Sequence, residues 1–313
     1  MTITQLTYVL ALAEHRNFTV AAEKCFVTQP TLSMQLQKLE DELKVSLFDR
    51  SKKPIAITEI GEKVVAQAKR IVSEANRMQD IVDQEQGFIG GEYTLGIIPT
   101  VMPTLLPMFL GHFMRKHPEV QLIIKEQATK DLVENLKEGN LDGAIAATPL
   151  ELDFIEERPL YYEPFVGYVP PSHRLHSNKM LLPQDLQLDD VLLLQDGHCF
   201  REGVINLCGR QGMSNQSSFQ LDSGSFETLT NLANEGLGMT LLPYLHTLEL
   251  KEEELANLKH FEAPAPAREI SLIYHNNELK IQITNALKEA IQSAVKSAIM
   301  FQDVEIVSPL AKS

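Results

Sequence analysis

An amphipathic run from Thr58 to Gln86 separates two differently patterned parts of this chain. The run contains no proline and no glycine except Gly61, and Thr58 followed by Glu59 and Glu62 is typical of a helix start. At 1.5 Å per residue, such a helix is about 43 Å long. Its apolar residues recur at steps of three or four: Ile60, Val64, Ala68, Ile71, Ala75, Met78 and Val82. This seam predicts a helix that pairs with a copy of itself, and the alternative is a helix packed on its own domain.

Gly87, Gly90 and Gly91 end the run and mark a domain boundary. With 313 residues, of which 44% are apolar, the chain is too long for one core, and we expect several domains. No segment approaches the roughly 20 apolar residues of a membrane span, and the first residues lack the basic flank of a signal peptide. We therefore expect a cytoplasmic protein that does not enter the membrane.

The three cysteines are an odd number for a structural disulfide framework, which is uncommon in the cytosol. Cys25 falls in an apolar helical pattern, where we expect a buried thiol acting as a small apolar side chain. Any disulfide between Cys199 and Cys208 should therefore form only under certain conditions and not as a permanent structural bond. Together with His198 these cysteines lack the compact spacing of a metal site, so we expect no metal and no cofactor.

A helix-turn-helix is predicted near the start of the chain, with helices at 18–25 and 29–39. Thr28 can cap the second helix. Leu32, Leu36 and Leu39 recur at i, i+4 and i+7 and should face the core. The candidates for contact with DNA bases or phosphates from this helix are Gln29, Pro30, Thr31, Ser33, Gln35 and Lys38. Any helical pair in a globular protein could show the same pattern.

A net charge of −14 argues at first against a nucleic-acid partner. The charge is unevenly distributed, however, because residues 1–60 carry seven basic and seven acidic side chains. Residues 45–58 resemble a short β-hairpin with a basic tip, in which Arg50, Lys52 and Lys53 would lie against the phosphate backbone. Contact with DNA is therefore expected at one end of the chain only.

These features resemble the LysR family of transcription regulators. The matching residues are Phe18, Ala21–Ala22, Gln29–Ser33 and Leu47–Arg50. The resemblance implies a winged helix-turn-helix DNA-binding domain at 1–58, a linker and dimerisation helix at 59–87, and a regulatory domain at 91–313. It also implies double-stranded DNA with inverted half-sites, a homodimer that assembles as a dimer of dimers, and RNA polymerase as a partner.

Strand and helix patterns alternate beyond Gly91. Strands are predicted at 93–98, 120–124, 141–147 and 270–274, with helices at 102–116 and 130–138. Thr129 could cap the latter helix, and Gly139 could form its left-handed end. The LysR resemblance implies a two-lobed α/β fold like that of periplasmic binding proteins, with lobe I at about 91–162 and 269–300 and lobe II at about 163–268. The tail from Val304 onward matches nothing, and we expect it to be flexible.

The segment from Asp196 to Cys208 contains residues suited to thiol redox chemistry. A thiol reacts with peroxide as its thiolate, which needs a positive environment, and His198 and Arg201 flank Cys199. A second thiol can then condense with the sulfenic acid. If 199–208 is helical, the two Cα atoms lie roughly 13 Å apart, about twice the reach of a disulfide, so bonding would unravel the segment. By spacing alone, two unconnected buried thiols remain the alternative.

Asp-Gly-His-Cys followed by a second cysteine nine positions later resembles the hydrogen-peroxide-sensing members of the LysR family. The resemblance implies that Cys199 is the peroxide-reactive thiol, that Cys208 resolves it, and that the oxidised form activates oxidative-stress genes. It also implies a peroxide pocket lined by Thr100, Thr129 and Arg268, with His198 beside the reactive thiol. Two residues differ from the expected pattern, because Glu202 stands in place of Asp and Ala267 in place of Arg. These differences bear on how strongly the reactivity of the thiol is tuned.

Two other functions are compatible with the sequence. One is a LysR regulator that binds a small metabolite in the cleft between its lobes, with incidental cysteines. The other is a thiol peroxidase, although an enzyme would have no use for a helix-turn-helix and a dimerising helix. We expect a regulator and not an enzyme.

Overall fold

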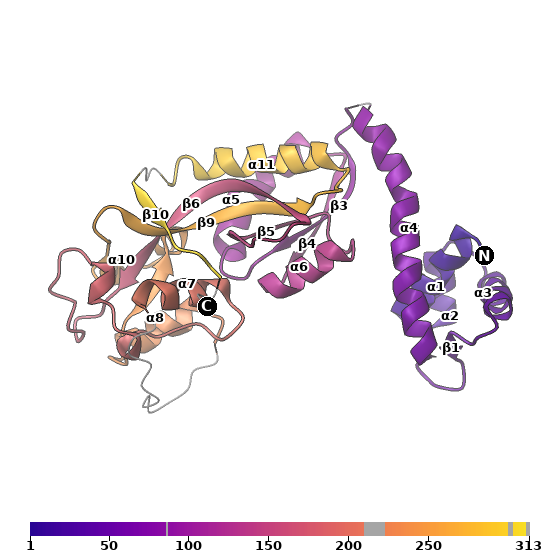
Figure 1. The fold of residues 1–313 in the computed structure, drawn as a ribbon, viewed down its shortest axis with the longest axis horizontal. Helices are drawn as coiled ribbons and strands as arrows, with labels where there is room; N and C mark the ends of the chain where they lie inside the picture. Colours follow the sequence, from indigo (N-terminus) through magenta and orange to yellow (C-terminus); the bar gives the residue numbers. More distant parts are fainter. Residues whose placement is uncertain (86, 210–222, 300–302, 311–313) are drawn as a thin grey trace. The chain divides into compact units, whose positions relative to one another are not determined.

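The computed structural model describes residues 1–85, 87–209, 223–299 and 303–310, and the chain divides into two compact units at 1–86 and 87–313 (Figure 1). Within the described residues, buried apolar side chains form one core in the first unit and two in the second. In the same ranges no helix has both the length and the apolar character needed to cross a bilayer.

The first unit consists of short helices, a β-hairpin and one long helix. The elements are α1 (Ile3–His15), α2 (Phe18–Lys24), α3 (Gln29–Leu43), β1 (Phe48–Asp49), β2 (Ala56–Ile57) and α4 (Glu59–Glu85). Local capping explains the helix starts, because Thr28 accepts the Thr31 N–H and Asn17 accepts two N–H groups at the start of α2. The predicted helix-turn-helix and hairpin are confirmed, and Leu32, Leu36 and Leu39 are buried in the core as expected.

The apolar seam of α4 is used in two ways. Ala68 is buried, and Val64 and Ile71 pack partly against the core of the first unit. Farther along the helix, Met78 and Val82 are exposed. The alternative prediction, that the helix packs on its own domain, is therefore correct for the first half of α4. The second half presents apolar side chains suited to a second copy.

The second unit contains one curled sheet in the order β4-β3-β5-β9-β6-β7. Its strands are β3 (Gly91–Ile97), β4 (Val120–Glu126), β5 (Gly143–Thr148), β6 (Ile155–Tyr168), β7 (Thr240–Pro243), β8 (Leu258–Lys259) and β9 (Ala265–His275). α5 (Met102–Lys116) and α11 (Ile281–Val295) lie over one face of the first part of this sheet, and α6 (Thr129–Lys137) lies on the other (Figure 1). Strands β3, β4 and β5 are parallel, whereas β9 runs antiparallel to both β5 and β6.

Strand β6 connects the two cores of the second unit. Its residues 155–164 pair with β9, and its last four residues pair with β7. Leu160 belongs to the first core, whereas Phe165 and Tyr168 belong to the second. Helices α7 (Cys199–Cys208) and α8 (Phe226–Asn234) contribute side chains to the second core. The remaining short elements of the second unit are α9 (Tyr244–Thr247), α10 (Glu252–Leu255) and the 3₁₀ turns η1 (Pro183–Asp185) and η2 (Leu188–Asp190). The expected two-lobed α/β architecture is confirmed.

Two local expectations are wrong. Thr129 does not cap α6, because the cap residue is Ala128 and no side chain accepts a hydrogen bond there. The described part of the tail, residues 303–310, is not free either, since β10 (Val304–Ile306) pairs in parallel with β9. Gly139, by contrast, has the predicted left-handed conformation, with φ of 71°. The free backbone edge of β9 at its start explains the ordered tail, because it offers hydrogen-bonding groups that a passing strand can satisfy.

Candidate redox site and DNA-binding face

Helix α7 places the two candidate redox cysteines at its opposite ends. Cys199 is its first residue and Cys208 its last, and both thiols are free. A helix rises 1.5 Å per residue, so their Cα atoms are separated by about 13 Å, well beyond the 4.4–6.8 Å of a disulfide. The predicted helical state of this segment is confirmed, and the two sulfurs cannot bond while it persists.

Cys199 is half-buried and packs against the first core of the unit. Its position at the start of α7 favours negative charge, because the helix dipole is positive there. The flanking residues differ from expectation. Burial lowers the pKa of His198, which keeps the imidazole neutral. The Arg201 guanidinium is paired with Asp196 at 2.8 Å and also donates to the Leu194 carbonyl. Neither side chain therefore supplies the positive environment that the sequence suggested.

Cys208 is held in its protonated form. Burial, with a smaller contribution from the Asp190 carboxylate, raises the pKa of Cys208 to about 12. The side chain packs against the second core together with Leu207. A thiol in this position is a poor nucleophile, so Cys208 must leave its surroundings before it can attack another sulfur.

Thr100 and Arg268 meet in a buried polar cluster. The Arg268 side chain donates from Nη1 to Thr100 Oγ1 at 2.9 Å and from Nη2 to the Thr100 carbonyl at 3.0 Å. Its guanidinium carbon lies 5.0 Å from the ring centre of Phe200, the residue that follows Cys199. The structure thus brings two of the predicted pocket residues together beside the start of α7.

Thr129 and His198 are placed differently from this pair. Among the described residues, the Thr129 hydroxyl is buried without a hydrogen-bond partner, which leaves it able to bind a small polar ligand. His198 precedes α7 as its cap residue but makes no side-chain capping bond. In the same described ranges, neither residue is hydrogen-bonded to Arg268 or Cys199, and no three potential metal ligands are grouped.

Glu163 was missed by the sequence reasoning. It lies on β6 directly opposite Arg268 on β9, and its carboxylate accepts the Arg268 Nε–H at 2.9 Å and lies 2.7 Å from Nη2. Both side chains are almost fully buried, with 1% and 3% of their surface exposed. Nothing in the local sequence distinguishes Glu163, because the same strand also carries Glu156, Glu157 and Arg158, and its partner follows more than a hundred positions later.

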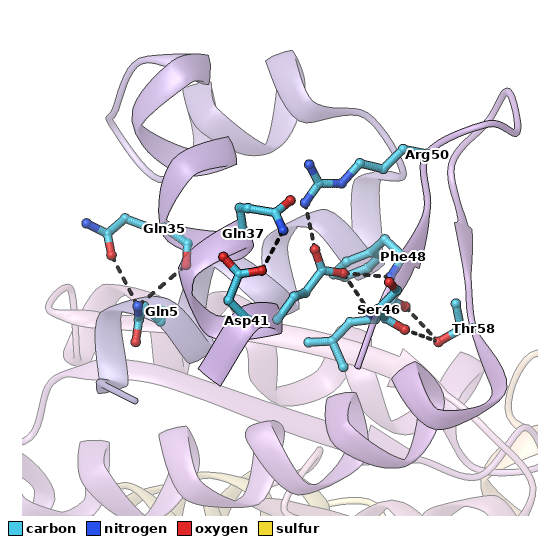
Figure 2. Close-up of polar contacts among 10 residues, drawn as sticks. Gln5, Gln35, Gln37, Asp41, Ser46, Phe48, Arg50 and Thr58 are labelled. Atoms are coloured by element: carbon cyan, nitrogen blue, oxygen red, sulfur yellow. Dashed lines mark hydrogen bonds and ion pairs between the residues drawn. The ribbon is translucent and has the colours of Figure 1, made fainter. Parts of the chain in front are cut away.

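Six of the predicted DNA-contact residues lie on α3. Gln29, Pro30 and Lys38 are exposed, whereas Thr31, Ser33 and Gln35 are partly buried. Gln35 accepts a hydrogen bond from the buried Gln5 of α1 at 3.2 Å, as Figure 2 shows. This contact fixes the orientation of α3 on α1 and leaves Gln35 less available to DNA than the other candidates.

The hairpin is tied to α3 through the buried Glu40. One carboxylate oxygen accepts the backbone N–H groups of Leu47 and Phe48, and the other accepts the Arg50 guanidinium at 2.6 Å. Figure 2 shows Arg50 reaching back toward α3. Arg50 thus stabilises the hairpin. Lys52 and Lys53 at the tip are exposed.

Comparisons with known proteins agree with this geometry. Residues 3–62 match the bacterial regulatory helix-turn-helix family of lysR type, and residues 86–296 match the LysR substrate binding domain. The chain is 34% identical to the Escherichia coli K12 "DNA-binding transcriptional dual regulator OxyR" over 94% of this chain and 95% of that protein. It is 35% identical to a "Hydrogen peroxide-inducible genes activator" of Pectobacterium carotovorum over 88% of this chain and 90% of that protein.

Solved structures give the same result over nearly the whole length. A full-length OxyR variant from Pseudomonas aeruginosa superimposes with a TM-score of 0.74 at 30% identity, covering 93% of this chain and 98% of that one. A Corynebacterium glutamicum OxyR mutant with hydrogen peroxide bound gives a TM-score of 0.63 at 30% identity, covering 95% and 93%. The chain belongs to the LysR family of helix-turn-helix regulators.

Proposed function

We propose that this protein is a transcription regulator that senses hydrogen peroxide through reversible formation of a Cys199–Cys208 disulfide and activates oxidative-stress genes. The observation that carries the proposal is the position of the two free cysteines at opposite ends of the ten-residue helix α7. The relatives that bear names of peroxide-inducible activators support it.

The chemistry proceeds in two balanced steps. The Cys199 thiolate attacks one peroxide oxygen, the O–O bond breaks, and the departing hydroxide takes up a proton to leave as water. The sulfur becomes a sulfenic acid. The Cys208 thiol then gives up its proton and attacks that sulfur, the S–O bond breaks, and a second water leaves as the disulfide forms. Hydrogen peroxide is the sole oxidant, and a cellular thiol system restores the reduced form.

The buried cluster beside Cys199 supports the first step. The Arg268 guanidinium can stabilise the charge that develops on the departing oxygen. The Thr100 hydroxyl is oriented by Arg268, and the unpartnered Thr129 hydroxyl can hold the oxidant. We assign His198 the role of shielding the thiol from solvent, because its neutral ring brings no charge to the site.

The second step provides the switch. Since the cysteines cannot meet while α7 is helical, the disulfide must form at the expense of the helix. Unwinding α7 removes Phe200 and Leu207 from the second core and so changes the shape of the second unit. Such a change can reorient the subunits of an oligomer and with them the paired DNA-binding units.

The DNA partner is double-stranded, with inverted half-sites that match the two-fold symmetry of a dimer. Gln29, Thr31, Ser33 and Lys38 with Pro30 face the major groove, and Lys52 and Lys53 contact phosphates. The exposed apolar side chains of α4 join two copies, and two such dimers form the tetramer. The proposal places the protein in the cytoplasm, in contact with RNA polymerase, and without enzymatic turnover.

Thiol mapping by mass spectrometry tests the proposal. The reduced protein is exposed briefly to one equivalent of hydrogen peroxide, trapped with an alkylating agent and digested. We expect a Cys199–Cys208 disulfide within seconds in the natural chain and in Cys25→Ala, the control, and none in Cys199→Ala. Slow oxidation scattered over all three thiols would contradict the proposal and favour a regulator that responds to a metabolite. Continuous consumption of peroxide with an added thioredoxin-type reductant would instead indicate a thiol peroxidase.

A further inference from the structure

Glu163 has no role in the two chemical steps of the proposed function, yet its side chain is almost fully buried. Its Oε2 atom accepts the Arg268 Nε–H at 2.9 Å and lies 2.7 Å from Nη2, so both nitrogens on one edge of the guanidinium are held by a single carboxylate oxygen. Its Oε1 atom accepts the backbone N–H of Leu245, in the first turn of α9, at 2.9 Å. The carboxylate is thus fixed at both oxygens.

This arrangement determines how the guanidinium is presented. A guanidinium is planar and donates along fixed directions, so binding one edge sets the direction of the other. With the Nε edge bound to Glu163, Nη1 donates to the Thr100 hydroxyl, and the guanidinium carbon lies over the Phe200 ring, 5.0 Å from its centre. The Thr100 carbonyl accepts a hydrogen bond from Nη2 and further restrains the guanidinium.

We propose that Glu163 is a positioning residue for the reaction of Cys199 with peroxide, acting through Arg268. The inference rests on the proposed function and extends it to a residue outside the pocket. Glu163 touches neither the thiol nor the oxidant. It orients the guanidinium so that the N–H groups on the side away from Glu163 are aligned before peroxide arrives, and alignment in advance is what makes such donors effective.

A purely structural role for Glu163 predicts a different pattern of effects. Loss of a buried ion-pair partner lowers stability whatever its function, so stability alone cannot separate the two roles. Alkylation of Cys199 by iodoacetamide also needs the thiolate and access, but its iodide leaving group needs no stabilisation of a departing oxygen. A positioning role therefore slows oxidation by peroxide selectively, whereas a general disturbance of the site changes both reactions.

The experiment compares the rate constants of Cys199 with hydrogen peroxide and with iodoacetamide by stopped flow and thiol trapping in the full chain. Glu163→Gln is expected to slow the peroxide reaction at least about tenfold, a fraction of the loss seen when an oxyanion donor is removed outright. Alkylation should stay within about twofold, and Glu163→Asp, which retains the charge and protects folding, should recover part of the peroxide rate. Glu157→Gln is the matched control, because Glu157 lies on the same strand and, among the residues that the structure describes, its carboxylate accepts a hydrogen bond from the backbone N–H of Leu150 alone, at 2.8 Å.

A double-mutant cycle with Arg268→Gln gives the decisive readout. If Glu163 acts through Arg268, then Glu163→Gln has no further effect on the peroxide rate once the guanidinium is gone. Additive losses, equal losses in both reactions, or a faster peroxide reaction in Glu163→Gln would overturn the inference. If the natural chain itself reacts slowly at Cys199, the proposed function fails first. If the natural chain and Glu163→Gln are both oxidised rapidly, the inference about Glu163 is overturned while the proposed function stands.

Discussion

Asn206 connects the redox helix to the end of the chain, and its replacement should shift the redox equilibrium. Its amide nitrogen donates to the carbonyl oxygens of Ser308 at 2.9 Å and Leu310 at 2.7 Å. The same segment is held by Val307, which donates its N–H to the Ala267 carbonyl and packs against the second core. All of these contacts belong to the reduced state, in which α7 is intact.

The size of the effect follows from the two hydrogen bonds. Each contributes about 0.5 to 1.5 kcal/mol net, so Asn206→Ala removes about 1 to 3 kcal/mol from the reduced, helical state. We expect the oxidised state, with α7 unwound, to lack these bonds in either variant. The dithiol therefore becomes less stable relative to the disulfide, and the reduction potential becomes more negative by about 20 to 65 mV for this two-electron couple.

Equilibration in glutathione buffers of graded potential, followed by thiol trapping and mass spectrometry, measures this shift. Asn135→Ala is the matched control, because Asn135 also makes two donor contacts from a helix, to the Asp131 carbonyl at 2.8 Å and to Gln127 at 3.2 Å, but lies on α6. An unchanged or less negative potential in Asn206→Ala would refute the reasoning. So would an equal shift in Asn135→Ala, which would show a general loss of stability.

Three further outcomes follow from other sites. Glu40→Gln should lower the free energy of unfolding of the first unit by about 2 kcal/mol in chemical denaturation, since Arg50 and two backbone N–H groups lose a charged acceptor. Lys52→Ala should weaken binding to all DNA sequences alike and reduce the slope of log affinity against log salt by about 1, measured by fluorescence anisotropy. Burial, with a smaller contribution from Asp142, raises the pKa of Glu278 from 4.5 to about 7. The folded state therefore binds the extra proton, so stability should fall by up to about 3 kcal/mol as the pH rises from 4.5 to 7, and Glu278→Gln should remove this dependence in thermal melts.

Short-range features of the fold could be predicted from the sequence because they depend on neighbours along the chain. Thr28 caps α3 through the N–H of a residue three positions later, and the apolar spacing of Leu32, Leu36 and Leu39 selects the buried face. The helical state of α7 and the separation of its cysteines are likewise properties of one short segment. The family resemblance supplied the two-lobed fold, which local patterns could not.

Tertiary structure alone decided which polar groups meet. Glu163 faces Arg268 because β6 and β9 pair in a register that no local pattern specifies. Thr129 resembled a cap in the sequence, but the turn before α6 leaves its hydroxyl buried and unpartnered among the described residues. Pairing with β9 and the Asn206 contacts order residues 304–310, which have no apolar periodicity of their own. Local spacing fixes helices and their faces, whereas contacts between distant segments depend on how strands align and which buried charges need partners.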